Sequence, residues 1–169
     1  YHSAINDAIY TARIFSNMDF ESVSIYESID TYRIPSSRKE EIYMNFKTYE
    51  KYISKGFKTR DKAAEDRIAR SCSCYICKSP MKRRIKWFAT SSKNYYSVFV
   101  CDEHGLFKGR MKVKQSDDGQ YYDVRILKHT DEAGVDKIID KQKKEREHRR
   151  RKRMEEHKRK VEARNSCNK

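Results

Sequence analysis

Two short motifs of cysteine and histidine constrain the fold of this chain more than any other feature of its sequence. The first is Cys74-Tyr-Ile-Cys77 and the second is Cys101-Asp-Glu-His104. A two-residue spacer lets both side chains of a tight turn point at one ion, and thiolates with an imidazole suit tetrahedral Zn²⁺. Four protein ligands leave no open coordination position, so we expect a structural zinc site formed by Cys74, Cys77, Cys101 and His104.

The region around these motifs has the pattern of a small β module. β-Rich runs at 85–90 and 95–100 flank four polar residues, and runs at 108–114 and 121–128 flank Asp117-Asp118-Gly119. Both patterns predict hairpins. A module of this size buries too little apolar area to fold well alone, and a bound ion compensates. We expect a zinc-ribbon-like β module over residues 71–129, and its resemblance to a zinc ribbon covers residues 74–104.

Two alternatives accompany the zinc assignment. Cys72 lies two residues before Cys74 and could replace it, although a one-residue spacer suits a ligand pair poorly. Ordinary buried thiols beside a surface histidine are the other interpretation, which two paired spacings around a hairpin disfavour. Iron normally prefers four thiolates, so the histidine favours zinc.

The charge of the chain indicates the class of its partner. Its 169 residues include 39 Lys and Arg against 25 Asp and Glu, a formal net charge of +14. Such an excess favours a polyanion, most simply nucleic acid, and we expect RNA. The cysteines are odd in number and clustered, which fits metal ligation in a reducing compartment. No run of about eighteen apolar residues occurs, so no membrane partner is expected.

Aromatic and basic residues are interleaved in the first hairpin, and cations alternate along the strand predicted after it. Exposed rings would stack on bases while the cations contact phosphates, and packing of the rings in the core is the alternative. A run of five basic residues, 149–153, adds a further cationic surface, for which a solvated helix without a partner is the alternative. The predicted nucleic-acid contacts are Trp87, Phe88, Tyr95, Lys86, Lys93, Lys108, Arg110, Lys112, Arg149, Arg150 and Arg151.

The segments outside the β module are predicted to be helical. Residues 1–18 carry apolar residues at steps of three and four, which is typical of an amphipathic helix. Residues 19–70 are expected to be a weakly packed helical connector, with a short strand before Pro35 and helices over 37–55 and 59–69. Residues 130–169 are predicted to form a long basic helix, capped by Thr130 and docked through apolar residues near its start.

The first residues resemble the last motif of the DEDDh 3′→5′ exonucleases, a family that includes RNase T, oligoribonuclease and a polymerase proofreading subunit. The resemblance covers about the first fifteen residues: His2, four intervening residues, Asp7-Ala8, then Thr11-Ala12 and a final Ile-Phe. It implies that residues 1–18 are the last helix of an RNase H-like exonuclease fold. Oligomerisation through the exonuclease part is also compatible with the resemblance. The resemblance favours a cytoplasmic protein, with a nuclear one as the alternative.

The resemblance also implies a mechanism, two-metal phosphodiester hydrolysis with Mg²⁺ or Mn²⁺. In that mechanism Asp7 is a catalytic metal ligand, and His2 is the catalytic base that takes a proton from the attacking water. The family's Asp-x-Glu motif and its second Asp precede the His, and no residue of this sequence can supply them. We therefore expect the remainder of such a domain to lie outside this sequence, and this chain alone to be inactive.

The sequence thus predicts an α+β protein and leaves two functions open. The first is the C-terminal part of a metal-dependent 3′→5′ exonuclease acting on nucleic acid, with the zinc ribbon and the basic helix holding the substrate. The alternative is a non-enzymatic zinc-ribbon protein that binds nucleic acid, in which the pairing of His2 with Asp7 is incidental. A protein-interaction module that uses the charged helix is a third class without specific support.

Overall fold

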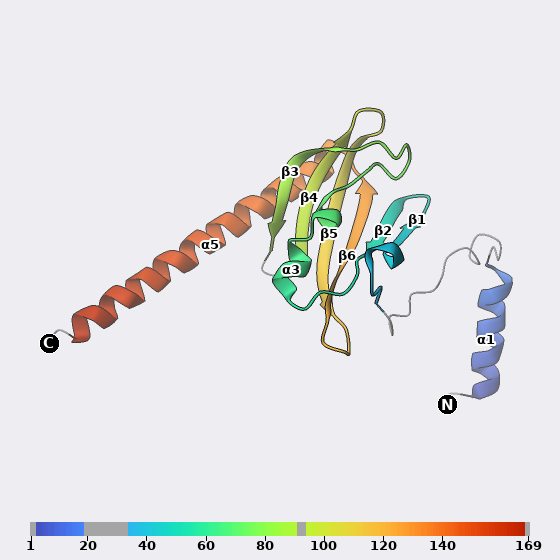
Figure 1. Cartoon of the computed structure of the whole chain (residues 1–169), viewed down its shortest axis with the longest axis horizontal. Helices are drawn as coiled ribbons and strands as arrows, with labels where there is room; N and C mark the ends of the chain where they lie inside the picture. The colour runs from blue at the N-terminus through green and yellow to red at the C-terminus, as the bar shows by residue number, and fades with distance from the viewer. Residues whose placement is uncertain (1–2, 19–33, 91–93, 168–169) are drawn as a thin grey trace. The chain divides into compact units, whose positions relative to one another are not determined.

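The computed structural model describes residues 3–18, 34–90 and 94–167, with side chains up to residue 162. It divides the chain into two units, residues 1–33 and residues 34–169. The fold is mixed α+β, as predicted, with a six-stranded antiparallel sheet and a long C-terminal helix in the second unit (Figure 1). Among the helices of the described ranges, none has the length and apolar character that crossing a bilayer requires.

The described part of the first unit is the helix α1 (Ala4–Ser16). This confirms the helix predicted from the three- and four-residue steps of its apolar residues. None of its residues is buried, and Ile5 and Ile9 are exposed. Whether α1 belongs to an RNase H-like fold stays a prediction, because one helix of this length occurs in many folds.

The sheet of the second unit has the strand order β1-β2-β6-β5-β4-β3, with every neighbouring pair antiparallel. The predicted hairpins are confirmed as β3–β4 and β5–β6, and Gly119 supplies a φ of +83° in the turn of the second. The strands are β1 (Ile42–Asn45), β2 (Tyr49–Ile53), β3 (Lys82–Ala89), β4 (Asn94–Cys101), β5 (Gly105–Gln115) and β6 (Tyr121–His129).

The helix predicted over residues 37–55 is wrong. A short 3-10 helix, η1 (Arg38–Glu40), precedes β1 and β2, which join the sheet along β6. The apolar residues of this segment fit a helical step, but pairing with β6 satisfies the backbone and lets Glu50 on β2 form an ion pair with Arg125 on β6. Tertiary context thus overrides a local pattern. The strand predicted before Pro35 falls mainly outside the described residues.

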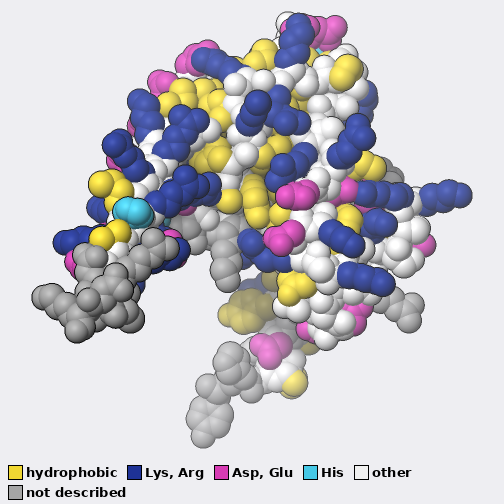
Figure 2. Space-filling view, turned by 60° about the vertical axis from the view of Figure 1, so that its left-hand side comes forward, with side chains coloured by type: hydrophobic (Ala, Val, Ile, Leu, Met, Phe, Trp, Pro, Cys, Tyr) yellow, Lys and Arg dark blue, Asp and Glu magenta, His cyan; other side chains and the backbone are white. Residues whose placement is uncertain are grey.

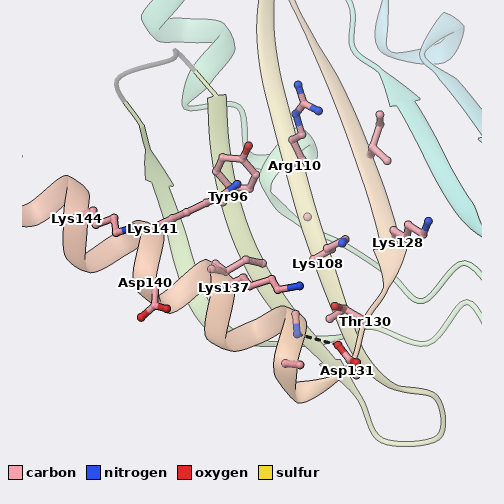
Figure 3. Close-up of a pocket in the computed structure, with 15 residues that line it drawn as sticks. Tyr96, Lys108, Arg110, Lys128, Thr130, Asp131, Lys137, Asp140, Lys141 and Lys144 are labelled. Carbon is pink, nitrogen blue, oxygen red and sulfur yellow. Dashed lines mark hydrogen bonds between the residues drawn. The ribbon is translucent and has the colours of Figure 1, made fainter.

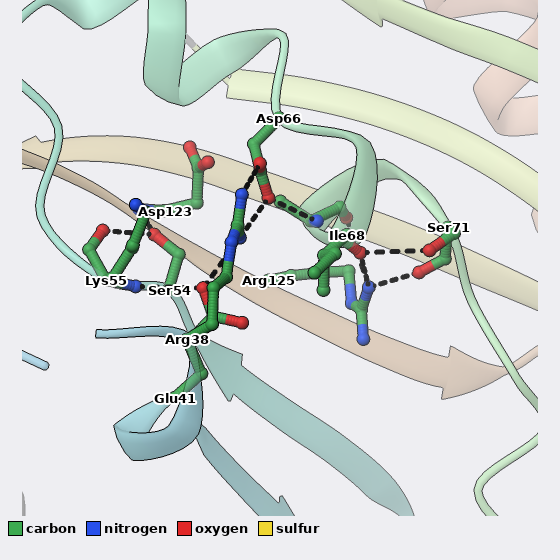
Figure 4. A network of polar contacts seen from close by, with 10 residues as sticks. Arg38, Glu41, Ser54, Lys55, Asp66, Ile68, Ser71, Asp123 and Arg125 are labelled. Atoms are coloured by element: carbon green, nitrogen blue, oxygen red, sulfur yellow. Dashed lines mark hydrogen bonds and ion pairs between the residues drawn. The ribbon is translucent and has the colours of Figure 1, made fainter.

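The helix predicted over residues 59–69 is interrupted. It forms two short helices, α3 (Arg60–Ala64) and α4 (Arg67–Arg70), because Asp66 leaves the helical conformation and caps the second. The Asp66 carboxylate accepts a hydrogen bond of 3.0 Å from the backbone N–H of Ala69 and also binds Arg38 (Figure 4). These helices pack on the sheet, where Ala63, Ala64 and Ala69 are buried.

The two faces of the sheet differ in character. Strand β5 buries Phe107, Met111 and Val113 on one face, which we call the core face, and exposes Lys108 and Arg110 on the other, which we call the open face. The core face packs against residues 57–81. Alternation of side chains along each strand makes this division possible.

The helix α5 (Glu132–Cys167) packs on the open face beside β3 and β4. Val135 and Ile138 are buried against Val98, as predicted for the first turns of this helix. The predicted cap at Thr130 is wrong, because the Asp131 carboxylate accepts a hydrogen bond of 2.8 Å from the backbone N–H of Gly134. Thr130 instead continues the sheet, with its N–H donating to the carbonyl of Leu106.

One buried carboxylate makes the stability of this fold depend on pH. Asp123 lies beside the polar network of Figure 4, and its carboxylate oxygens have no hydrogen-bond partner among the described residues. Burial raises the pKa of Asp123 to about 8. The native state therefore binds a proton that the unfolded state releases above about pH 4, so stability falls between about pH 4 and pH 8.

We expect Asp123→Asn to remove the fall in stability between about pH 4 and pH 8. The free energy of unfolding of the variant, relative to the native chain, should increase with pH by up to about 1.4 kcal/mol per pH unit. Urea unfolding at pH 5 and at pH 8 measures it, with the exposed Asp117→Asn as the control. If the free energies of unfolding of Asp123→Asn and the native chain differ by the same amount at both pH values, Asp123 does not have a raised pKa.

Candidate metal centre

The four predicted zinc ligands come together in the structure. The donor atoms of Cys74, Cys77, Cys101 and His104 all lie within 4.8 Å of one another. The Sγ atoms of Cys77 and Cys101 are 3.6 Å apart, and the Nδ1 atom of His104 is 3.7 Å from the Sγ atoms of Cys74 and Cys101. A tetrahedral zinc ion separates its ligands by about 3.5–3.8 Å, so these residues lie close enough to hold a metal ion and are compatible with structural zinc.

The backbone of both motifs has the same local form. In each motif the residue after the second ligand has a positive φ, +63° at Lys78 and +74° at Gly105. Glycine adopts this conformation without a steric penalty, whereas lysine pays about 1 kcal/mol or more. The first turn is also held by a hydrogen bond of 2.8 Å from the N–H of Lys78 to the carbonyl of Cys74.

The two motifs occupy defined positions in the fold. Cys101 ends β4 and pairs with Gly105 at the start of β5, so the second motif is the turn between these strands. The first motif lies before β3 in a segment that belongs to no strand. A metal held by all four ligands would therefore tie this segment to the β4–β5 turn.

Cys72 lies outside the cluster, which decides between the two cysteines that the sequence left open. Its side chain is 7% exposed and packs with Tyr75, Phe99 and Phe107. Burial raises the pKa of the Cys72 thiol to about 11. Cys72 is therefore an inert core residue, and Cys74 is the ligand candidate.

The cluster differs from ordinary buried thiols in its electrostatics. Hydrogen bonds from the hydroxyl and the backbone N–H of Ser79 lower the pKa of Cys77 to about 6, whereas burial raises the pKa of Cys74. Hydrogen bonds with Cys101 and Cys77 raise the pKa of His104. The lowered pKa favours the thiolate form of Cys77, which is the form that binds a metal.

Searches against protein-family models, curated proteins and solved structures found no match for this chain. The geometry of its own residues therefore carries the assignment of the site.

The residues of the exonuclease resemblance form no second cluster in the described part of the chain. His2 lies outside the described residues. Asp7 lies in the first turns of α1 and is exposed, and its backbone carbonyl accepts a hydrogen bond of 2.8 Å from the hydroxyl of Thr11. Within the described ranges, the group of four zinc ligands is the one set of three or more His, Cys, Asp or Glu donors that lies this close. Nothing there supports a Mg²⁺ or Mn²⁺ site.

The aromatic residues predicted to stack on bases contribute to the core. The indole N–H of Trp87 donates to the carbonyl of Arg70 at 2.9 Å, and its ring meets Phe99 edge to face. Phe88 packs in the cluster below α5, and Tyr95 packs against the clusters on the core face. Core packing was the alternative interpretation of these rings, and their contact with bases stays a prediction.

The predicted cations are exposed wherever the structure describes them. Lys86 on β3 and the four cations of β5 are exposed, and Lys93 lies outside the described residues. Arg149 on α5 donates to the carbonyl of Ala89 at 2.7 Å, and Arg150 and Arg151 are exposed. Four cations outside the predicted set line a groove together with Lys108 and Arg110: Lys128, Lys137, Lys141 and Lys144. Their proximity depends on where α5 docks, which no local pattern indicates.

We expect the purified protein to carry about one zinc ion per chain, as a closed four-ligand site requires. Cys77→Ser should lose the zinc, because it removes one of the four donors. Cys72→Ala is the matched control and should keep the metal, with at most a modest loss of stability. Elemental analysis after gel filtration measures both, and equal zinc content in Cys77→Ser and in the native chain would rule out this centre.

Proposed function

We propose that this chain binds nucleic acid, preferably RNA, through the open face of its sheet and the adjoining helix α5, with a structural zinc ion stabilising the sheet. One observation carries the proposal. Strand β5 places four cations at alternate positions, all exposed on the face opposite the core: Lys108, Arg110, Lys112 and Lys114. A row of cations on an open sheet face suits the phosphate backbone of a polyanion.

The register of the sheet extends this positive surface across neighbouring strands. Lys108 on β5 pairs with Lys128 on β6, so two like charges lie directly opposite each other. Like charges in this arrangement destabilise a sheet, which indicates that the cations serve a purpose other than stability. Figure 2 shows many Lys and Arg side chains, with fewer Asp and Glu, around apolar side chains on one side of the molecule.

The cations of this surface form few ion pairs within the described part of the chain. Among the residues that the structure describes, no carboxylate forms an ion pair with Lys108, Arg110 or Lys128. Arg110 does donate a hydrogen bond of 3.2 Å to the side-chain oxygen of Asn94, which leaves its charge uncompensated. A set of cations that outnumbers the carboxylates around it favours an anionic ligand over a structural role.

The second half of α5 adds a cationic arm. Its side chains from 150 to 162 are all exposed, and this part of the helix extends beyond the sheet (Figure 1). Ion pairs one turn apart, Arg149–Glu145 and Lys158–Glu162, support the helix, each by about 0.2–0.5 kcal/mol. The basic run 149–153 lies at the start of this arm, adjoining the sheet surface.

The arm should contribute to the salt dependence of binding. We expect replacement of Arg150, Arg151 and Arg153 together by Gln to make the slope of log affinity against log salt less steep by about 2. Each phosphate contact contributes about 0.7 to this slope for a single strand. Fluorescence anisotropy with labelled RNA from 50 to 200 mM salt measures it. The control variant, Lys39→Gln, Lys62→Gln and Arg67→Gln, has the same net charge and should keep the native slope. Equal slopes for both triple variants would contradict the role of the arm.

The exonuclease resemblance provides a second candidate function. The observation that favours it is that the described part of the motif forms one helix with the side chain of Asp7 exposed. In this candidate Asp7 binds a catalytic Mg²⁺ or Mn²⁺ and His2 activates the attacking water, while the second unit holds the substrate.

This candidate requires the remaining carboxylates of the family, so its test needs a protein in which they accompany this chain. Asp7→Asn should lower Mg²⁺-dependent release of 3′ nucleotides by about 100-fold or more while RNA binding remains. Asn6→Ala, an exposed change on the same helix, should leave hydrolysis unchanged. Retained hydrolysis in Asp7→Asn would remove the exonuclease candidate without affecting the binding proposal.

A further inference from the structure

A groove runs between the first half of α5 and the open face of strands β4–β6, with a volume of about 740 Å³ (Figure 3). Lys137, on the α5 side of the groove, points toward Lys108 on β5, with Lys128 farther across the sheet. Half-buried Ile126 and Tyr96 line the part of the groove formed by the sheet. The groove therefore has an apolar floor and a cationic rim.

The register explains how apolar and cationic groups alternate in the groove. Arg110 on β5 pairs with Tyr96 on β4 and with Ile126 on β6, which makes one row across the open face. Lys108 and Lys128 form the next row, two residues along the strands and so about 6.7 Å away. Tyr96 and Ile126 thus flank Arg110 in one row and lie directly beside Lys108 and Lys128 of the next.

Tyr96 has a role that sequence analysis did not predict. The Nζ atom of Lys141 lies 4.6 Å from the centroid of the Tyr96 ring, a cation–π geometry. This contact holds a flexible lysine side chain at the wall of the groove. Tyr96 therefore positions a cation of the rim.

The charge balance of the groove selects an anion. Six cations line it, against two carboxylates, Asp131 and Asp140. The Asp131 carboxylate is engaged as the cap of α5 through the N–H of Gly134. A cationic groove of this kind attracts phosphates over distances of several ångströms.

The apolar floor distinguishes between two forms of nucleic acid. In a duplex the base faces are stacked inside the helix and only phosphates and groove edges reach the protein. In a single strand an unpaired base offers its face to an apolar surface while its flanking phosphates contact cations. From this, and resting on the proposed nucleic-acid function, we infer that the groove binds single-stranded nucleic acid, with a base against Ile126 and the adjoining phosphates between β5 and α5.

The test compares two probes, a fluorescein-labelled RNA strand of about 12 nucleotides and the blunt duplex of the same sequence, by anisotropy with the full chain. The single strand should bind at least about tenfold more tightly. Ile126→Ala should weaken binding of the single strand about fivefold and leave the duplex unaffected. Ile68→Ala, the same truncation at an exposed residue of α4 away from the groove, should change neither.

A rim variant makes the test independent of any loss of folding in Ile126→Ala. Lys141 is exposed, so Lys141→Gln should keep the native melting temperature while reducing the salt slope for the single strand by about 0.7. Lys62→Gln, an exposed change on α3, is the matched control. Equal affinity for both probes, with no effect of Lys141→Gln, would overturn the groove and leave the proposed function standing. Failure of both probes to bind would overturn the groove and the proposed function together.

Discussion

The convergence of Cys74 and Cys77 with Cys101 and His104 is the contact on which the rest of the second unit depends. It joins a segment without strands to the β4–β5 turn, and that segment covers the core face. Tyr75, between the ligands of the first motif, meets Phe107 edge to face at 5.5 Å. A metal ion at this point would thus stabilise both the turn and the packing around it, which a small β module needs.

The functional proposals depend on which face of the sheet the rest of the chain covers. Because residues 57–81 occupy that face, the opposite one is left to α5 and to solvent. Alternation along β5 then exposes every second residue, and those residues are cations. The first turns of α5 cover only the part of the open face beside β3 and β4, which creates the groove at the boundary between the helix and the exposed strands. The metal centre and the groove thus lie in one sheet but serve different purposes.

The sequence predicted the structure best where a residue type has one physical role. The ligand spacings, the alternating cations of β5 and the apolar residues at the start of α5 were all predicted correctly as structural features. Residues 37–55 were predicted wrongly, because the ion pair of Glu50 with Arg125 and the pairing of β2 with β6 connect residues far apart in the chain. The contact of Lys141 with Tyr96 depends equally on long-range docking. Lys78 was missed because lysine gives no signal of a positive φ.

The central claim is that one metal ion holds the module in the shape that binds nucleic acid. It is tested most directly by titrating the protein with a zinc chelator while recording circular dichroism and the anisotropy of labelled RNA in the same sample. The account predicts that sheet structure and RNA binding are lost together as zinc is removed, and that both return when zinc is added back. A metal-free protein that keeps its sheet and its affinity for RNA would contradict the account.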